Sequence, residues 1–312
     1  MADSRSVRVE HEPEEGSTLT HGSFTFRSAD SGKELFVRTS SLSHVTTESA
    51  SALILLHGYA AHSLFPSVRF LATFAAAHGF YTLGLDAEGH GKSAGLRGRV
   101  KPANASASDV LQLAEKLRAQ NPLRKVFVCG GSMGGAVALH ALHRGGNSVS
   151  GAVLLAPLVG LERTQKPPQW QISLLKAVAW VAPNAPLLSP NTSDPRAHFR
   201  NLELAQYVED DKLKYTSRMR LGSAKELMMM ATTAKTKAKE IGRPMLFVHG
   251  REDTVVPFED SQEIVNDTGT SSDKELYEVS SLHGVLCDPP EKREEIAEYI
   301  VKWLQRRAQP GK

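Results

Sequence analysis

The sequence predicts an α/β fold in which a mostly parallel sheet carries helices on both faces and is interrupted by an inserted helical lid. Short apolar, β-branched runs alternate with segments of helical spacing, and the connections between them are short. One long proline-rich stretch breaks this alternation. The 312 residues suffice for one large domain with an insertion. We therefore expect a disordered tail at 1–16, a core made of 17–156 and 222–312, and a lid at 157–221.

The first part of the core is expected to be a hairpin followed by a buried strand. Residues 23–27 and 34–39 alternate apolar and polar side chains around a Ser-Gly turn, which is a hairpin signal. Residues 52–56 are all apolar and run directly into His57-Gly58-Tyr59. This pattern is typical of a buried strand that ends at a loop.

The remaining elements continue the alternation of strand and helix. In the helix expected at 108–120, for example, apolar residues recur at helical spacing on one face. The other helices are expected at 65–78, at 136–142 and around Ile296–Leu304, and the other strands at 80–85, 126–128, 151–156, 244–248 and 275–279.

The predicted lid, 157–221, contains seven prolines and two tryptophans but no clear strand. Its segment 171–182 is apolar almost all the way round. Such a helix is either buried in the lid's own core, or its apolar flank lines an acyl pocket or touches a membrane surface. We expect Trp170, Ile172 and Leu175 to contact the substrate.

Composition excludes several classes of protein. The net charge of +3, without a run of basic residues, argues against a nucleic-acid partner. Cys129 and Cys287 make no disulfide framework, and the chain starts without an apolar signal segment, so the cytoplasm is the expected location. Membrane association through the lid is the alternative. No metal-ligand spacing occurs, and we expect neither metal nor cofactor. The sequence leaves the oligomeric state open.

The stretch 125–142, KVFVCGGSMGGAVALHAL, carries the main catalytic motif. Gly130-x-Ser132-x-Gly134 stands between a predicted strand and a predicted helix, which is the nucleophile-elbow pattern. Glycines are needed because the tight turn strains the serine and brings neighbouring backbone close. We predict that Ser132 is the nucleophile. A second G-x-S-x-G, at 91–95, is followed by a basic stretch and forms no elbow.

A serine hydroxyl needs a base, and the base needs an orienting carboxylate. In proteins with this elbow the partners follow in the order serine, acid, histidine. Asp253, just after the strand at 244–248, is the expected acid, with Glu252 as the alternative. Of the 12 histidines only His283 follows Asp253, and it comes directly after the strand at 275–279. Cys287 lies four residues after His283, so we expect thiol reagents to inhibit the protein by modifying this cysteine.

Two backbone N–H groups are expected to stabilise the oxyanion. Met133 directly follows the nucleophile, and Tyr59 lies on the loop after the early strand, where Gly58 lets the backbone turn. His57 is expected to anchor this loop through hydrogen bonds and not to carry a proton.

These motifs together resemble the monoacylglycerol lipase and lysophospholipase-like serine hydrolases of the α/β-hydrolase superfamily, plant-type members most of all. The likeness spans roughly residues 22 to 305 and rests on His57-Gly58-Tyr59, on 86–95, on 130–135, on Gly250-x-x-Asp253 and on His283. It implies the α/β-hydrolase fold, the triad Ser132, Asp253 and His283, the oxyanion donors Tyr59 and Met133, and a lid that forms a tunnel for one acyl chain.

The sequence thus predicts a metal-free carboxylic ester hydrolase acting on a monoacylglycerol or a lysophospholipid. One alternative is a carboxylesterase or thioesterase for small acyl or aromatic esters. A second is a peptidase of the proline-iminopeptidase kind, which needs acidic lid residues to hold an amino group; the candidates are Glu162, Glu203, Glu209 and Asp210. A third is a non-catalytic ligand-binding protein on the same scaffold, against which the complete triad counts.

Overall fold

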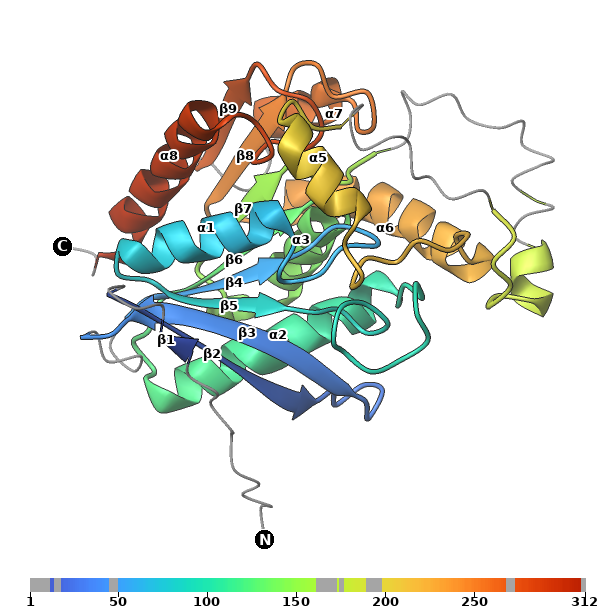
Figure 1. The fold of residues 1–312 in the computed structure, drawn as a ribbon, viewed down its shortest axis with the longest axis horizontal. Helices are drawn as coiled ribbons and strands as arrows, with labels where there is room; N and C mark the ends of the chain where they lie inside the picture. Colours follow the sequence, from blue (N-terminus) through green and yellow to red (C-terminus); the bar gives the residue numbers. More distant parts are fainter. Residues whose placement is uncertain are drawn as a thin grey trace, which may run out of the picture.

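The computed structural model describes residues 12–13, 18–44, 50–160, 173, 177–188, 198–267 and 273–309. Their strands form one sheet (Figure 1). The strands are β1 (Glu12–Pro13), β2 (Leu19–Arg27), β3 (Glu34–Leu42), β4 (Ala52–Leu56), β5 (Tyr81–Leu85), β6 (Val126–Gly131), β7 (Gly151–Leu155), β8 (Met245–Gly250) and β9 (Lys274–Val279). Their order is β1-β2-β3-β5-β4-β6-β7-β8-β9; the six strands from β5 onwards run parallel, and the first three form an antiparallel edge.

Helices cover both faces of this sheet, as the sequence predicts. Those of the described residues are α1 (Pro66–Ala77), α2 (Ala103–Gln120), α3 (Met133–Arg144), α5 (Leu202–Glu209), α6 (Leu221–Glu240), α7 (Phe258–Asn266), α8 (Pro290–Ala308) and a 3₁₀ turn, Gly146–Ser148. One apolar core joins the sheet to α1 and α8, and the other joins it to α2, α3 and α6 (Figure 1). The predicted α/β-hydrolase arrangement is confirmed.

The predicted hairpin is confirmed, and its strands are longer than expected. The register runs from Leu19 opposite Leu42 to Arg27 opposite Glu34. The apolar alternation stops at Thr39, yet the polar residues beyond it are buried: the Ser40 hydroxyl lies 2.8 Å from His21 Nδ1. Polar side chains that satisfy each other continue the strand where the hydrophobic pattern ends. Within the predicted tail, β1 pairs with β2.

Two helices were not predicted because their cores are made of small or polar residues. In α6 the buried positions include Ala231, Ala234 and Ala238, which give a weak apolar signal. In α7 two of the four buried residues are Asp260 and Ser261. α6 begins where the lid was predicted to end.

The lid is described only in part. Residues 177–181 are helical, and α5 lies further along the same insertion. Trp180 is 85% exposed and Val181 is 76% exposed, so this part of the apolar segment is not buried in the lid. Trp170, Ile172 and Leu175 lie outside the described residues. Across the described ranges, no helix has the length and apolar character needed to cross a membrane.

Candidate active site

Ser132 lies in a sharp turn between β6 and α3. Its φ of 50° and ψ of −116° are strained for a residue with a side chain. A methyl group on Gly130 would lie 2.7 Å from the Gly135 nitrogen, and one on Gly134 would lie 2.7 Å from the His57 carbonyl oxygen. Glycine is therefore required at both positions. The turn leaves Ser132 at the positive end of the α3 dipole.

Asp253 and His283 are brought together by the ends of two neighbouring strands. Asp253 follows β8, His283 follows β9, and His283 Nδ1 donates to Asp253 Oδ2 over 2.7 Å. The other carboxylate oxygen accepts the backbone N–H groups of Val255 (2.8 Å) and Val256 (3.0 Å). Burial by itself would raise the pKa of Asp253, but these hydrogen bonds, together with one from His249, hold it well below the usual range. Asp253 is thus a buried carboxylate that fixes the tautomer of His283.

Glu252, the alternative acid, takes part in a different interaction. It is exposed, accepts a hydrogen bond from the Ser280 hydroxyl over 3.0 Å and pairs with Arg200. The carboxylate bonded to His283 is therefore that of Asp253.

The loop after β4 faces the serine. A methyl group on Gly58 would lie 3.6 Å from the Ser132 Cβ atom. His57 is buried; its Nδ1 lies 2.7 Å from the Gly58 carbonyl oxygen, and its Nε2 accepts the Ala87 N–H over 3.0 Å. Burial lowers the pKa of His57, so the ring is a neutral anchor for the loop.

Met133 and Tyr59 are the two residues whose N–H groups are expected to bind an oxyanion. Met133 is the first residue of α3, where an N–H has no acceptor inside the helix. Tyr59 is the third residue of the loop after β4, and its ring packs edge-on against His90 and Tyr215, with centroid distances of 5.7 and 6.3 Å. Met133 thus follows Ser132 directly, and Tyr59 follows Gly58, on which a methyl group would lie 3.6 Å from the Ser132 Cβ atom.

The second G-x-S-x-G has a structural role. The Ser93 hydroxyl donates to the Asp86 carbonyl oxygen over 2.6 Å and accepts the Phe36 N–H over 2.8 Å. The Asp86 carboxylate accepts the N–H groups of Ser63 (2.6 Å) and Lys92 (2.7 Å). Asp86 and Ser93 therefore brace the loop after β4 against the strands beside it.

The end of the lid contacts both loops of the site, which the sequence did not indicate. Tyr215 N–H donates to the Ala60 carbonyl over 2.9 Å, and His62 Nε2 lies 2.6 Å from Asp211 Oδ2. On the other side, Gly284 N–H donates to the carbonyl oxygen of residue 198 over 3.0 Å. Residues 198–215, the returning limb of the lid, thus join the loop after β4 to the loop that carries His283.

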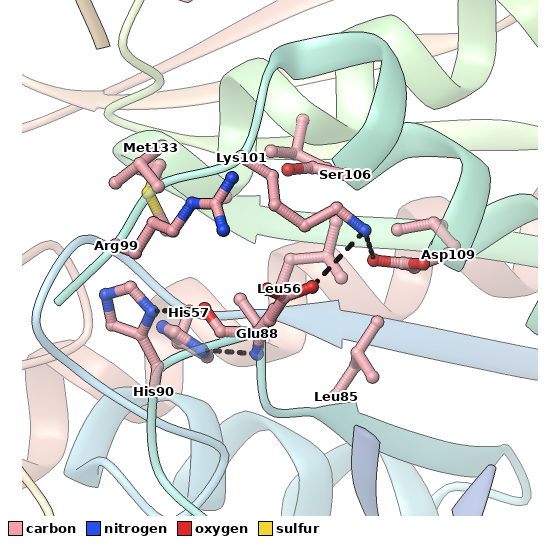
Figure 2. A pocket seen from close by; sticks show the side chains of 15 residues that line it. Leu56, His57, Leu85, Glu88, His90, Arg99, Lys101, Ser106, Asp109 and Met133 are labelled. Carbon is pink, nitrogen blue, oxygen red and sulfur yellow. Dashed lines mark hydrogen bonds and ion pairs between the residues drawn. The ribbon is translucent and has the colours of Figure 1, made fainter. Parts of the chain in front are cut away.

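A cavity of about 40 Å³ lies at the end of β4 and the start of the loop that follows it (Figure 2). His57 and Met133 line one part of it, and the Lys101 side chain points towards Asp109 and Glu88, with Nζ 2.9 and 3.8 Å from their oxygens. A cavity of this size holds only a few water molecules, since each needs about 10–15 Å³. The cavity is therefore too small for an acyl chain. Among the described residues, no group of three or more metal-ligating side chains occurs.

Residues 47–290 match the Hydrolase_4 family, described as serine aminopeptidase S33. The chain is 25% identical over 261 residues to a monoacylglycerol lipase of Mycolicibacterium smegmatis, covering 83% of this chain and 90% of that one. It is 23% identical to a caffeoylshikimate esterase of Arabidopsis thaliana, covering 83% and 79%. The solved structure of a Paleococcus ferrophilus monoacylglycerol lipase superposes with a TM-score of 0.73 at 25% identity, covering 88% and 99%.

The matched range contains the elbow, the Asp253–His283 pair and the loop after β4, and the fold agrees with that of a solved relative. The chain belongs to the Hydrolase_4 family of α/β-hydrolases and is similar to its monoacylglycerol lipases.

Proposed function

We propose that this protein is a serine hydrolase that cleaves the ester bond of a single-acyl-chain lipid, monoacylglycerol in the first place and lysophospholipid in the second. The observation that carries the proposal is the hydrogen bond of 2.7 Å between Asp253 and His283, combined with the strained elbow at Ser132. Because Nδ1 of His283 is occupied by Asp253, Nε2 is the nitrogen left to act as a base.

The proposed reaction proceeds through an acyl-enzyme. His283 takes the proton of the Ser132 hydroxyl as the oxygen attacks the ester carbonyl, and the oxyanion is bound by the N–H groups of Met133 and Tyr59. His283 then protonates the departing alcohol. In the second half it deprotonates water, which attacks the acyl group and releases the fatty acid.

The described part of the lid supports a lipid substrate. Trp180, Val181 and Leu187 are 85%, 76% and 56% exposed, which is unusual for such large apolar side chains. We propose that these residues contact a membrane or micelle surface while the acyl chain enters. Trp170, Ile172 and Leu175 remain the proposed acyl contacts. The similarity to a caffeoylshikimate esterase keeps an aromatic-ester substrate as the second candidate.

The peptidase alternative has less support. Glu203, Glu209 and Asp210 are exposed on or beside α5, so they are solvated and not gathered as a binding site for a substrate amino group. Glu162 lies outside the described residues.

The test is labelling with a fluorophosphonate, followed by a substrate panel. The wild type should be labelled and Ser132→Ala should not; an unlabelled wild type would favour the binding-protein alternative. The panel comprises monoacylglycerols, lysolipids, caffeoyl and short nitrophenyl esters, and aminoacyl amides. Activity confined to caffeoyl or short esters would refute the lipid assignment. In Trp180→Ser, a smaller fraction of the protein should sediment together with anionic vesicles. The variant should also be less active on micellar substrate and equally active on monomeric substrate.

A further inference from the structure

A second imidazole contacts the carboxylate that binds His283. His249 of β8 is fully buried, and its Nε2 lies 3.2 Å from Asp253 Oδ2, the oxygen that also accepts from His283. The Val256 carbonyl oxygen lies 3.1 Å from the same nitrogen. A carbonyl oxygen can only accept, so Nε2 of His249 carries a hydrogen in either charge state of the ring. His249 therefore donates to Asp253.

The opposite side of the His249 ring is held by α7. The Ser261 hydroxyl, fully buried, lies 2.8 Å from Nδ1, and the Phe258 ring packs edge-on at a centroid distance of 5.8 Å. These contacts fix the orientation of His249. A continuous series of hydrogen bonds thus runs from Ser261 through His249 and Asp253 to His283.

We infer that His249 is a positioning residue, which holds the Asp253 carboxylate in place and shares its negative charge with His283. The inference rests on the proposed function, in which His283 is the base. Without His249, His283 would be the one residue, among those that the structure describes, that donates a hydrogen bond to Oδ2 of Asp253. A more concentrated charge on Asp253 favours the protonated form of His283, and a protonated His283 cannot accept the proton of Ser132.

The other charged and titratable side chains around this series are paired or at the edge of the site. They are Arg251 with Glu278, Glu252 with Arg200, Asp288 with Arg200 at 3.8 Å, Asp260 with Lys235 at 3.7 Å, Glu263 with Lys235 at 2.9 Å, the first-turn Glu259 of α7, and His198, whose ring centroid is 6.2 Å from that of His283. The exposed pairs are screened by solvent, and the buried Asp260 and Asp288 keep their cationic partners in every variant that is compared. The acid side of the pH profile should therefore respond to His249 more than to these groups.

The experiment compares pH profiles of kcat/KM on a soluble nitrophenyl ester. In His249→Leu the acid side should move up by about half to one pH unit, so that the loss is about 3- to 10-fold larger at pH 6 than at pH 8, with KM little changed. His249→Gln keeps an N–H donor and should recover part of the shift. The control measures the loss of a buried histidine alone: His140→Leu removes a buried histidine of α3 that lies outside this hydrogen-bond series. This control should lower Tm without moving the acid side of the pH profile.

A folded His249→Leu whose acid side coincides with that of the wild type would overturn the inference, as would an equal shift in His140→Leu. If the leucine variant does not fold, His249→Gln gives the same test with a smaller shift.

A second measurement needs no turnover. The hydrogen-bonded Nδ1–H of His283 should give a far-downfield proton resonance, identified by its loss in His283→Ala. This resonance should move in both His249 variants, and an unchanged resonance would contradict the inference even if no ester is cleaved. Absence of all esterase activity, in contrast, would refute the proposed function.

Discussion

Gly134→Ala tests the packing that places the oxyanion loop beside the elbow. The added methyl group would lie 2.7 Å from the His57 carbonyl oxygen, 0.7 Å short of ordinary contact at 3.4 Å, and it would also touch the Leu56 carbonyl. Both obstacles are backbone atoms, and the Leu56 carbonyl oxygen is the nearer one, so α3 must move away from the end of β4 and the loop after it by at least about 0.7 Å. Because a misplacement of about 1 Å in an active site can cost about 100-fold, we expect kcat/KM to fall by roughly that factor. Overpacking should lower the stability by about 1–3 kcal/mol.

The matched control is the neighbouring Gly131→Ala. A methyl group there meets only the Leu155 carbonyl oxygen at 3.9 Å, and Gly131 does not have a positive φ. Its kcat/KM should stay within about threefold of the wild-type value, since no backbone has to move. Steady-state kinetics on a nitrophenyl ester and urea unfolding give the two readouts. Equal kcat/KM in the two alanine variants would refute this account of the elbow.

Three further predictions follow from individual side chains. Asp253→Asn should lower kcat by about 10⁴-fold because an amide cannot hold the His283 tautomer, whereas Glu252→Gln, an exposed group, should change it less than about twofold; similar losses in the two variants would contradict the assignment. Burial lowers the pKa of His140 to about 4, so the native state resists protonation that the unfolded chain accepts below about 6.5. This group should therefore cost about 3 kcal/mol of unfolding free energy as the pH falls from about 6.5 to 4. Urea unfolding of His140→Gln at several pH values should show that its unfolding free energy falls less between about pH 6.5 and pH 4 than that of the wild type. An equal fall in the two proteins would contradict this prediction. Cys287 is 1% exposed, and burial raises the pKa of its thiol to about 12, which argues against the expected sensitivity to thiol reagents. Iodoacetamide should leave native activity intact; inhibition that Cys287→Ser abolishes would reverse this conclusion.

The sheet and the local catalytic motifs could be predicted because they depend on short-range signals. A buried strand is a run of apolar residues, and the elbow needs glycine at fixed positions around Ser132, so both are visible in a few consecutive letters. The pairing of Asp253 with His283 followed from chain order and parallel-strand topology. The three triad roles themselves stay predictions until the labelling experiment is done.

What could not be predicted depends on contacts across the chain. The sequence favoured Asp253 over Glu252, but only the folded turn shows that Asp253 faces His283 while Glu252 faces Arg200 and Ser280. His249 looks in the sequence like the last buried residue of a strand, and only the folded turn at 250–256 brings Asp253 back onto its ring. Helix α6 was missed because its buried alanines give a weak apolar signal, and α7 because it is short and only Phe258 and Ile264 of its four buried residues are apolar.

The attachment of the returning lid limb limits how this protein can be re-engineered. Exchanging 157–221 as one segment would replace the substrate-facing surface of the lid. It would also remove the contacts of Asp211 and Tyr215 with the loop after β4, and the contact of residue 198 with the loop of His283. The splice on the C-terminal side belongs before residue 198, so that the recipient keeps its own limb. Chimaeras built at that joint keep the backbone contacts of residues 198–215 with the two loops, and need a replacement for the hydrogen bonds that 183–188 make with 219–222.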